Sequence, residues 1–278
     1  VWLAEPLQIG SDTKGDVHIT RGGSAANVAC AAAGLVPTRF IGCVGTDFLG
    51  DLVASSLEEF NIDVRLQRRG STGVVVVLID DDGERTMVPS RGASALLCDV
   101  DPDWLADVAV LHLTAYSLES GTTASEVVRL ARLTHKSGGL VTIDTSSSAV
   151  LEKFGIDRFF DSLSEIQPDV VFANRQEWDV LSLTEVVVDR PAALESTVFV
   201  CKAGADPTTV HPPEGTVITV PVPHVDGVLD TTGAGDAFAG GFLARLVEGA
   251  SWRECCETGH AIAAHVLTRP GAGSTLPT

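Results

Sequence analysis

The sequence predicts an α/β fold in three layers, in which a mostly parallel sheet lies between helices and a small β-lid stands apart. One observation predicts the core: from about residue 39 onward, short β-branched or apolar runs alternate with helical patterns, as in βαβ units. A second observation predicts the lid, because one hairpin pattern interrupts this alternation. The 278 residues, 45% of them apolar and 20% charged, are typical of a compact globular chain.

The predicted core elements follow from residue type and periodicity. Strands are predicted at residues 39–44, 108–113, 140–144, 169–173, 197–202 and 216–220. Helices are predicted between them, where Ala-rich or apolar residues recur at helical spacing. These helices cover residues 24–35, 47–60, 125–135 and 252–267, and Gly34 is a stop signal for the first of them.

The lid prediction depends on residues 73–88. Two apolar runs, 73–79 and 84–88, flank an Asp-Gly pair whose positive φ angles suit a tight hairpin turn. We expect this hairpin to project from the core and to pair with extended segments near the start of the chain, such as residues 17–20. An antiparallel edge of the main sheet is the alternative. The predicted division is a core of residues 22–70 and 92–278 with a β-lid of residues 1–21 and 71–91.

Charge and composition exclude several partners. The chain carries 19 Lys and Arg against 37 Asp and Glu, a net charge of −18, which argues against binding nucleic acid or an anionic membrane. No run approaches about 18 apolar residues, and no signal peptide is visible. The six cysteines lack C-x-x-C spacing, so we expect buried free thiols in a reducing cytoplasm. Because the chain begins at Val1 without Met, we expect the natural protein to have residues that precede it.

The most informative segment is residues 230–246, where glycines precede an apolar helical pattern. Gly233 to Asp236 would fall at a helix N-terminus, where unpaired N–H groups and the helix dipole stabilise an anion. Asp236 then has two interpretations. It is an ordinary acidic residue in a first helical turn, or it is a base that takes a proton from a hydroxyl while the N–H groups hold phosphoryl oxygens.

Two further clusters have similar positions. Gly22 and Gly23 precede a helix in which Asn27 occupies the first turn, so the Asn27 amide either faces a ligand or only supports capping and close packing. Asn174 and Glu177 follow a predicted strand, at the edge where open α/β sheets bind ligands. A glutamate there can order water around Mg²⁺, although an N-cap followed by Glu is also a common capping pair.

Motifs of other enzyme classes are missing from the sequence. It contains no G-x-x-x-x-G-K-[ST], no H-E-x-x-H or Cys/His array, no G-x-S-x-G and no early G-x-G-x-x-G. These absences weigh against P-loop proteins, zinc enzymes, α/β-hydrolases and ordinary dinucleotide-binding domains.

Four motifs in order resemble those of the ribokinase-like (PfkB) carbohydrate kinases. The C-terminal motif is Asp-Thr-Thr-Gly-Ala-Gly-Asp-Ala-Phe at 230–238, and the N-terminal one combines residues 22–29 with 40–51. Between them stand Asn174 with Glu177 and then Lys202 with Gly204. The resemblance extends over essentially the whole chain.

The resemblance implies a ribokinase-like core, a β-lid over the acceptor site, and transfer of the ATP γ-phosphate to a hydroxyl of a small sugar or sugar-like acceptor, with Mg²⁺. Asp236 would be the base, and the amides of Gly233, Ala234 and Gly235 the anion hole. The other implied residues form two groups. The acceptor would meet Gly22, Gly23, Asn27 and, as a substitute for an early acidic residue of the family, Asp12; the nucleotide would meet Asn174, Glu177 (through Mg²⁺-bound water), Lys202, Gly204 and Thr232.

Many members of the family also bind a monovalent cation beside the anion hole, so the resemblance implies K⁺. Its ligands would come from the loop before the last motif and from a C-terminal loop. The matching positions are Asp230, Thr232, Val266, Arg269, Gly271 and Thr275.

The resemblance implies a first strand with an early acidic residue, which is absent here and would precede Val1 in the natural protein. Other departures from the family motifs bear on the acceptor. Residues 92–94 read Gly-Ala-Ser where ribokinases carry Gly-Ala-Asn, and residues 144–148 also differ, so ribose is not the favoured acceptor. Arg21, Arg85 and Arg91 stand near the predicted lid, where they either meet an acidic sugar or are solvated charges.

Two other functions remain as alternatives: a nucleoside kinase of the same fold, and a non-catalytic sugar-binding or regulatory protein. A nucleoside kinase would need apolar or aromatic stacking groups in the lid, and the predicted lid offers only Trp2 and aliphatic residues. The intact Asp236 motif argues against the non-catalytic alternative. An exposed lid edge favours a homodimer.

Overall fold

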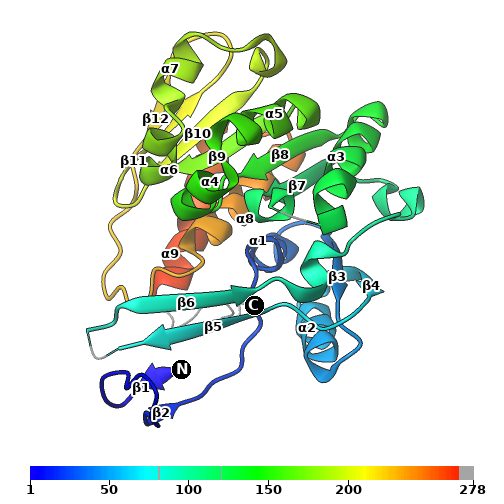
Figure 1. Ribbon diagram of the computed structural model, residues 1–278. Coiled ribbons are helices and arrows are strands. Elements are labelled where there is room, and N and C mark those ends of the chain that lie inside the picture. Colours follow the sequence, from blue (N-terminus) through cyan, green and yellow to red (C-terminus); the bar gives the residue numbers. More distant parts are fainter. Residues whose placement is uncertain (81, 120, 269–278) are drawn as a thin grey trace.

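The computed structural model describes residues 1–80, 82–119 and 121–268, and it has a layered core with a smaller sheet beside it (Figure 1). In the central sheet the strand order is β12-β11-β10-β9-β8-β7. The bounds are β7 (Val110–Thr114), β8 (Leu140–Asp144), β9 (Val170–Asn174), β10 (Val198–Ala203), β11 (Asp206–His211) and β12 (Ile218–Val220). Strands β7 to β10 are parallel, which confirms the mostly parallel sheet.

The edge formed by β11 and β12 is antiparallel. Its cause is the short connection after β10, where Gly204 has a φ of +64° and the chain turns directly into β11. Parallel neighbours need a long crossover, so a turn this short permits only an antiparallel pair. The expected strand near residues 216–220 therefore exists, but it belongs to a meander and not to a βαβ unit.

Helices cover both faces of this sheet. On one face lie α3 (Gly121–Lys136), α4 (Ser148–Phe154), α5 (Ile156–Ile166), α6 (Arg175–Val180) and α7 (Leu183–Val188), and on the other lie α1 (Ser24–Ala33), α8 (Ala234–Val247) and α9 (Trp252–Leu267). Successive residues of β9 face opposite sides. Val171 packs in the cluster that contains Leu163 of α5, whereas the Phe172 ring lies 5.0 Å from that of Phe242 on α8.

A parallel pair, β3 (Arg39–Val44) and β4 (Asp63–Arg68), is joined by α2 (Phe48–Glu58). Asp47 caps α2, since its side chain accepts a hydrogen bond from the Gly50 N–H at 3.0 Å. The same carboxylate accepts from the N–H of Thr72 at 2.8 Å, just before the lid hairpin begins. One aspartate thus fixes both a helix start and the entry of the lid. Single helical turns complete the chain at η1 (Gly92–Ala95), η2 (Pro102–Leu105), η3 (Ala115–Leu118) and η4 (Ala192–Leu194).

The smaller sheet has the strand order β2-β1-β5-β6, with β1 (Trp2–Leu3), β2 (Gly15–Asp16), β5 (Val74–Ile79) and β6 (Arg85–Ser90). We call these four strands the lid. β5 and β6 pair antiparallel, as the hairpin pattern predicts. The hairpin pairs with a segment near the start of the chain, as expected, but the example of residues 17–20 is wrong. Trp2 pairs with Ile79, and the amino group of Val1 donates to the carbonyl of Val77 at 2.6 Å. The first residues thus occupy the β5 edge that residues 17–20 were expected to cover.

Two further expectations can be compared with the described residues. No helix among them has the length and apolar character needed to cross a membrane. All six cysteines are free thiols, and all except Cys98 are buried.

Candidate active site

The candidate site begins where the N-terminal turns of α1 and α8 meet. The two helices pack closely at Gly240, where an added Cβ would lie 2.5 Å from the Cβ of Ala31 and 2.8 Å from the carbonyl oxygen of Val28. Only glycine permits this approach. The first turn of α1, which carries Ser24 and Asn27, consequently lies against the first turn of α8, which carries Asp236.

Asp236 is held by two donors from α1. The Ser24 hydroxyl donates to Oδ1 of Asp236 at 2.7 Å, and the Asn27 amide Nδ2 donates to Oδ2 at 2.8 Å. Burial raises the pKa of Asp236, although these two hydrogen bonds act in the opposite direction. The structure therefore joins two sequence-predicted residues, Asp236 and Asn27. Ser24 was not assigned a role, and its place beside Asn27 at the start of α1 was the available signal.

Backbone donors lie beside this carboxylate. Gly233 precedes α8 with a φ of +79°, a conformation that glycine adopts without strain. The Ala234 N–H makes a turn hydrogen bond of 3.3 Å to the Thr231 carbonyl. In the described part of the chain, the N–H groups of Gly233 and Gly235 have no such acceptor. Two of the three predicted anion-hole amides are thus free to bind an anion.

A buried ion pair adds charge to the site. Lys202, at the end of β10, pairs with Asp144 at the end of β8, and their side chains are 14% and 6% exposed. Burial alone would lower the pKa of Lys202, but the carboxylates of Asp144 and Glu177 outweigh it and the net direction is upward. The Lys202 Nζ lies 3.3 Å from the position of a Cβ on Gly235, so the ammonium stands over the start of α8. Asp144 was not predicted, although it ends a predicted strand at the ligand-binding edge.

Glu177 forms the capping pair that its motif allows, while its role toward Mg²⁺ stays a prediction. It forms a capping box with Asn174 at the start of α6, accepting from the Asn174 N–H at 2.8 Å, and it also accepts from the Thr145 hydroxyl at 2.6 Å. Its side chain is nevertheless buried beside Asp144, and burial first and the Asp144 charge second raise its pKa. A divalent cation would relieve this repulsion, and carboxylate oxygens are ligands that Mg²⁺ prefers. The residues present therefore fit Mg²⁺.

The lid reaches the site through Arg85 on β6. Its guanidinium donates to Oδ1 of Asp230 at 2.6 Å and also to the Thr232 hydroxyl, and the Thr232 N–H donates to the same Asp230 oxygen at 2.8 Å. The loop before α8 is thereby tied to the lid. Arg85 and Asp230 lie 145 residues apart, so the sequence did not predict this contact. It indicated for Arg85 either an acidic acceptor or a solvated position.

The other two lid-side arginines are also not freely solvated. Arg91 pairs with Glu119, with 2.7 Å between Nε and Oε2, and lies over the Tyr116 ring. Arg21 is 8% exposed and donates from Nη1 to the Asn27 Oδ1 at 2.9 Å.

The remaining predicted residues are more dispersed. Asp12 lies exposed on the loop between β1 and β2, and Gly204 lies exposed in the turn after β10. Val266 packs against Ala31 and Ala237, so its side chain is part of the core. Arg269, Gly271 and Thr275 lie outside the described residues. The roles assigned to these residues stay predictions.

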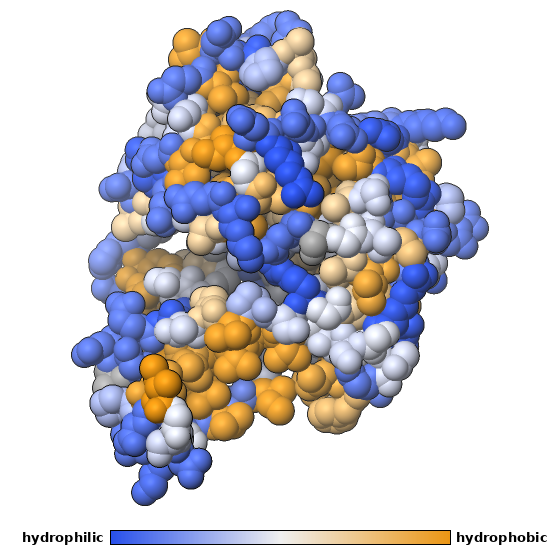
Figure 2. All heavy atoms as spheres, viewed as in Figure 1, coloured by the Kyte–Doolittle hydropathy of each residue, from blue (hydrophilic) through white to orange (hydrophobic). Residues whose placement is uncertain are grey.

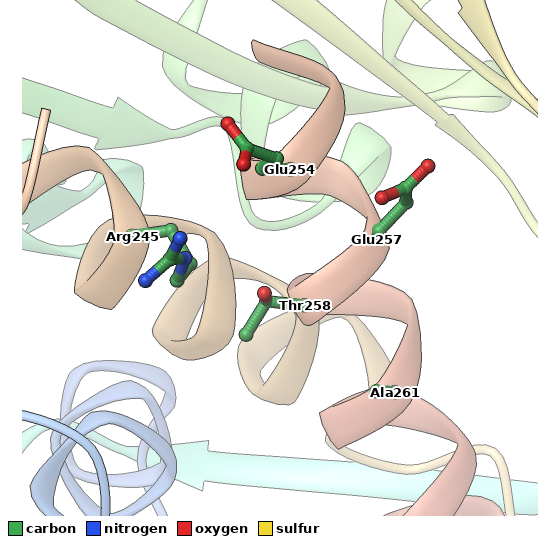
Figure 3. Close-up of a pocket in the computed structure, with 5 residues that line it drawn as sticks. All are labelled: Arg245, Glu254, Glu257, Thr258 and Ala261. Atoms are coloured by element: carbon green, nitrogen blue, oxygen red, sulfur yellow. The ribbon is translucent and has the colours of Figure 1, made fainter. Parts of the chain in front are cut away.

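A surface hollow of about 470 Å³ lies elsewhere (Figure 3). It is lined by Arg245 of α8 and by residues of α9, namely Glu254, Glu257, Thr258 and Ala261. Because Arg245 lies near the end of α8 and Asp236 near its start, this hollow is separate from the candidate site.

Known proteins resemble this chain over most of its length. A family model described as pfkB family carbohydrate kinase matches residues 7–278. An ATP-dependent ribose-1-phosphate kinase of Halopiger xanaduensis is 34% identical over 259 residues, covering 91% of this chain and 82% of that protein. A ribokinase of Haemophilus influenzae is 28% identical, covering 94% and 85%.

Solved kinase structures also resemble this chain over most of its length. An adenosine kinase from Sinorhizobium meliloti matches with a TM-score of 0.80 at 28% identity, covering 90% of this chain and 79% of that one. A ribokinase from Thermotoga maritima matches with a TM-score of 0.82 at 24% identity, covering 99% and 91%, and this second likeness supports the fold alone.

Proposed function

Because the chain belongs to the pfkB family of carbohydrate kinases, we propose that it transfers the ATP γ-phosphoryl group to a hydroxyl of a small sugar or sugar-like acceptor, with Asp236 as the base. The observation that carries this proposal is the meeting of two helix starts. Asp236 on α8 is oriented by Ser24 and Asn27 of α1, beside the N–H groups of Gly233 and Gly235, for which the described residues supply no acceptor.

The proposed step follows from these groups. Asp236 accepts the proton of the acceptor hydroxyl while the hydroxyl oxygen forms a bond to the γ-phosphorus and the bond to the ADP oxygen breaks. The N–H groups and the Lys202 ammonium stabilise the negative charge on the transferring group. Phosphoryl transfer depends mainly on positioning and charge stabilisation. A raised pKa brings the Asp236 carboxylate closer to the range in which a base works best near neutral pH.

The nucleotide side of the site is assigned to Asn174, Glu177, Lys202 and Asp144. Glu177 and Asp144 would lie nearest to a bound Mg²⁺, which would supply positive charge against the nucleotide phosphates. Glu177 would hold it through water, since the carboxylate oxygens of Glu177 already accept hydrogen bonds from Thr145 and Asn174.

We propose K⁺ as an additional ion, bound mainly through backbone carbonyls. The Asp230 carboxylate already pairs with the Arg85 guanidinium, so the backbone carbonyls of this loop, and not that carboxylate, would bind K⁺. Activity assayed in K⁺ and in a bulky organic cation tests the assignment, and equal rates would contradict it.

We also propose that a second copy of the chain covers the lid. Val74, Val75, Val76, Met87 and Val88 are between 39% and 57% exposed, and Figure 2 shows apolar residues gathered over the lid in the lower part of the view. Light scattering should give a dimer for the wild type and a monomer for Val76→Lys. A monomeric wild type would refute this assembly. Free thiols favour a reducing, cytoplasmic location.

The decisive experiment is an ATP-consumption screen with sugars, sugar acids, sugar phosphates and nucleosides, run on wild type and Asp236→Asn in parallel. We expect turnover of a sugar-class acceptor that the variant largely loses. Turnover of nucleosides alone would favour the nucleoside kinase, a function named for the Sinorhizobium relative. Binding without turnover of any acceptor would favour a regulatory protein.

A further inference from the structure

Arg21, Arg85 and Arg91, the three arginines near the lid, differ in whether a carboxylate pairs with them. Arg85 pairs with Asp230, and Arg91 pairs with Glu119. Among the described residues, no carboxylate lies within ion-pair distance of Arg21, although Arg21 is the most buried of the three. Burying a guanidinium without an opposite charge is costly. Arg21 therefore carries a positive charge that no carboxylate of the described residues pairs with.

The position of Arg21 points to the acceptor side. Its Nη1 donates to the Asn27 Oδ1 at 2.9 Å, and the Asn27 Nδ2 donates to the candidate base Asp236 at 2.8 Å. Arg21 is thus one side chain away from the group that would receive the acceptor proton. Its guanidinium carbon lies 5.9 Å from the centre of the Phe60 ring, which supports the planar group.

The backbone beside Arg21 leaves room for a ligand. A Cβ built on Gly22 or on Gly23 would meet no heavy atom within 4 Å. The remaining guanidinium nitrogens of Arg21 make no hydrogen bond to the described residues, and neither of them is fully buried. Donors that are neither paired within the described residues nor fully buried can face a ligand next to these glycines.

We propose that Arg21 binds an anionic group of the acceptor, a phosphate ester or a carboxylate, and so selects acidic sugars over neutral ones. The inference rests on the proposed function, because it takes the acceptor hydroxyl to lie at Asp236. Arginine suits both anions, whose paired oxygens match its planar donors. With a net charge of −18, the protein as a whole repels such an acceptor, so a local cation is needed to hold it.

A purely structural role for Arg21 makes a different prediction. If Arg21 only orients Asn27, its removal should weaken every acceptor equally, whatever the acceptor's charge. Selection by charge requires the loss to be confined to anionic acceptors.

The test measures binding and turnover for two matched pairs of probes: ribose 1-phosphate against ribose, and gluconate against sorbitol. Calorimetry and kinetics are run on wild type, Arg21→Gln, Arg21→Lys and the control Arg91→Gln. In the wild type, one anionic probe should bind at least about tenfold tighter than its neutral partner. Arg21→Gln should lose about 10- to 100-fold for that probe and less than about twofold for the neutral one.

The other variants sharpen the result. Arg21→Lys should keep part of the preference, and Arg91→Gln should affect both members of each pair alike. The pair that responds identifies the anion as phosphate or carboxylate. A wild type without charge preference, including one that binds neither anionic probe, or an equal loss for both members in Arg21→Gln, overturns the inference. Charge-selective binding without any turnover would instead refute the kinase function alone.

Discussion

Asp236→Asn is the sharpest perturbation of the candidate site, because it removes a proton acceptor while keeping the side-chain shape. The Asp236 oxygens accept from the Ser24 hydroxyl at 2.7 Å and from the Asn27 amide at 2.8 Å. A hydroxyl can also accept a hydrogen bond. The new amide can donate to Ser24 and still accept from Asn27, so we expect both contacts between α1 and α8 to persist.

Stability should follow the raised pKa of Asp236, which burial causes. An aspartate has a pKa of about 3.9 in an unfolded chain. Between that value and the higher folded one, the folded state binds more protons, so wild-type stability falls as the pH rises through this window. Because asparagine does not ionise, Asp236→Asn removes this pH-dependent loss of stability. Thermal unfolding at pH 7 should therefore show a variant at least as stable as the wild type.

Activity should change far more than stability. A positioned general base contributes about 10²- to 10⁴-fold in rate, which corresponds to about 3 to 5 kcal/mol of barrier. We expect kcat to fall by that factor while the KM for ATP stays within about twofold, since Lys202 and Glu177 are untouched. Coupled ATP-consumption kinetics measure both constants. Ser24→Ala is the matched control, and it should lose only a few-fold because the carboxylate remains.

A folded Asp236→Asn protein with kcat within about threefold of wild type would refute the reasoning. The proton would then have another acceptor, and the meeting of α1 and α8 would serve orientation alone.

Three further predictions concern Lys202 and Glu177 on the nucleotide side and Gly233 before α8. Lys202→Met should raise the KM for ATP about 10- to 100-fold. It should also lower the melting temperature, because it leaves Asp144 buried without its partner, and adding Asp144→Asn should restore that temperature. A Lys202→Met protein as stable as the wild type would contradict this reasoning. Glu177→Gln should shift the Mg²⁺ concentration for half-maximal rate upward by about tenfold, and an unchanged Mg²⁺ titration would remove Glu177 from the metal site. Gly233→Ala should cost about 1 to 2 kcal/mol of unfolding free energy because its φ is +79°, and denaturant titration with no loss would show that the turn relaxes.

Elements with strong local signals were predicted closely. Residues 39–44 and 140–144 form strands within the predicted bounds, and α9 spans the predicted residues 252–267. In α9, a capping box between Ser251 and Glu254 fixes the start, so sequence-local chemistry determines the boundary.

Elements without such signals were missed. β4 carries Asp63, Arg65 and Arg68, which are polar because this strand lies in a two-stranded pair away from the main core. The antiparallel strand β11 was also missed, since it begins directly after the turn at Gly204 and contains Pro207. Such strands are stabilised by their neighbours and not by an alternating apolar pattern.

In the candidate site, too, local motifs were predicted and long-range contacts were not. The glycines before Asp236 and the Asn174–Glu177 pair are local motifs, so sequence alone suggested them. Ser24 and Asp236 are 212 residues apart, and Arg85 and Asp230 are 145 apart. Contacts of this kind arise only from tertiary packing, which places a lid strand and two helix starts around one loop.

The close contact at Gly240 has a consequence for how the protein changes shape. Since α1 and α8 pack almost backbone to backbone, Asn27, Ser24 and Asp236 belong to one rigid body whose internal geometry is set during folding. Acceptor binding then requires little reorganisation of these groups, and the entropy of aligning them has already been lost before substrate arrives. Movement during a catalytic cycle would then fall to the lid, whose Arg85 bonds to Asp230 and Thr232 in the loop before α8.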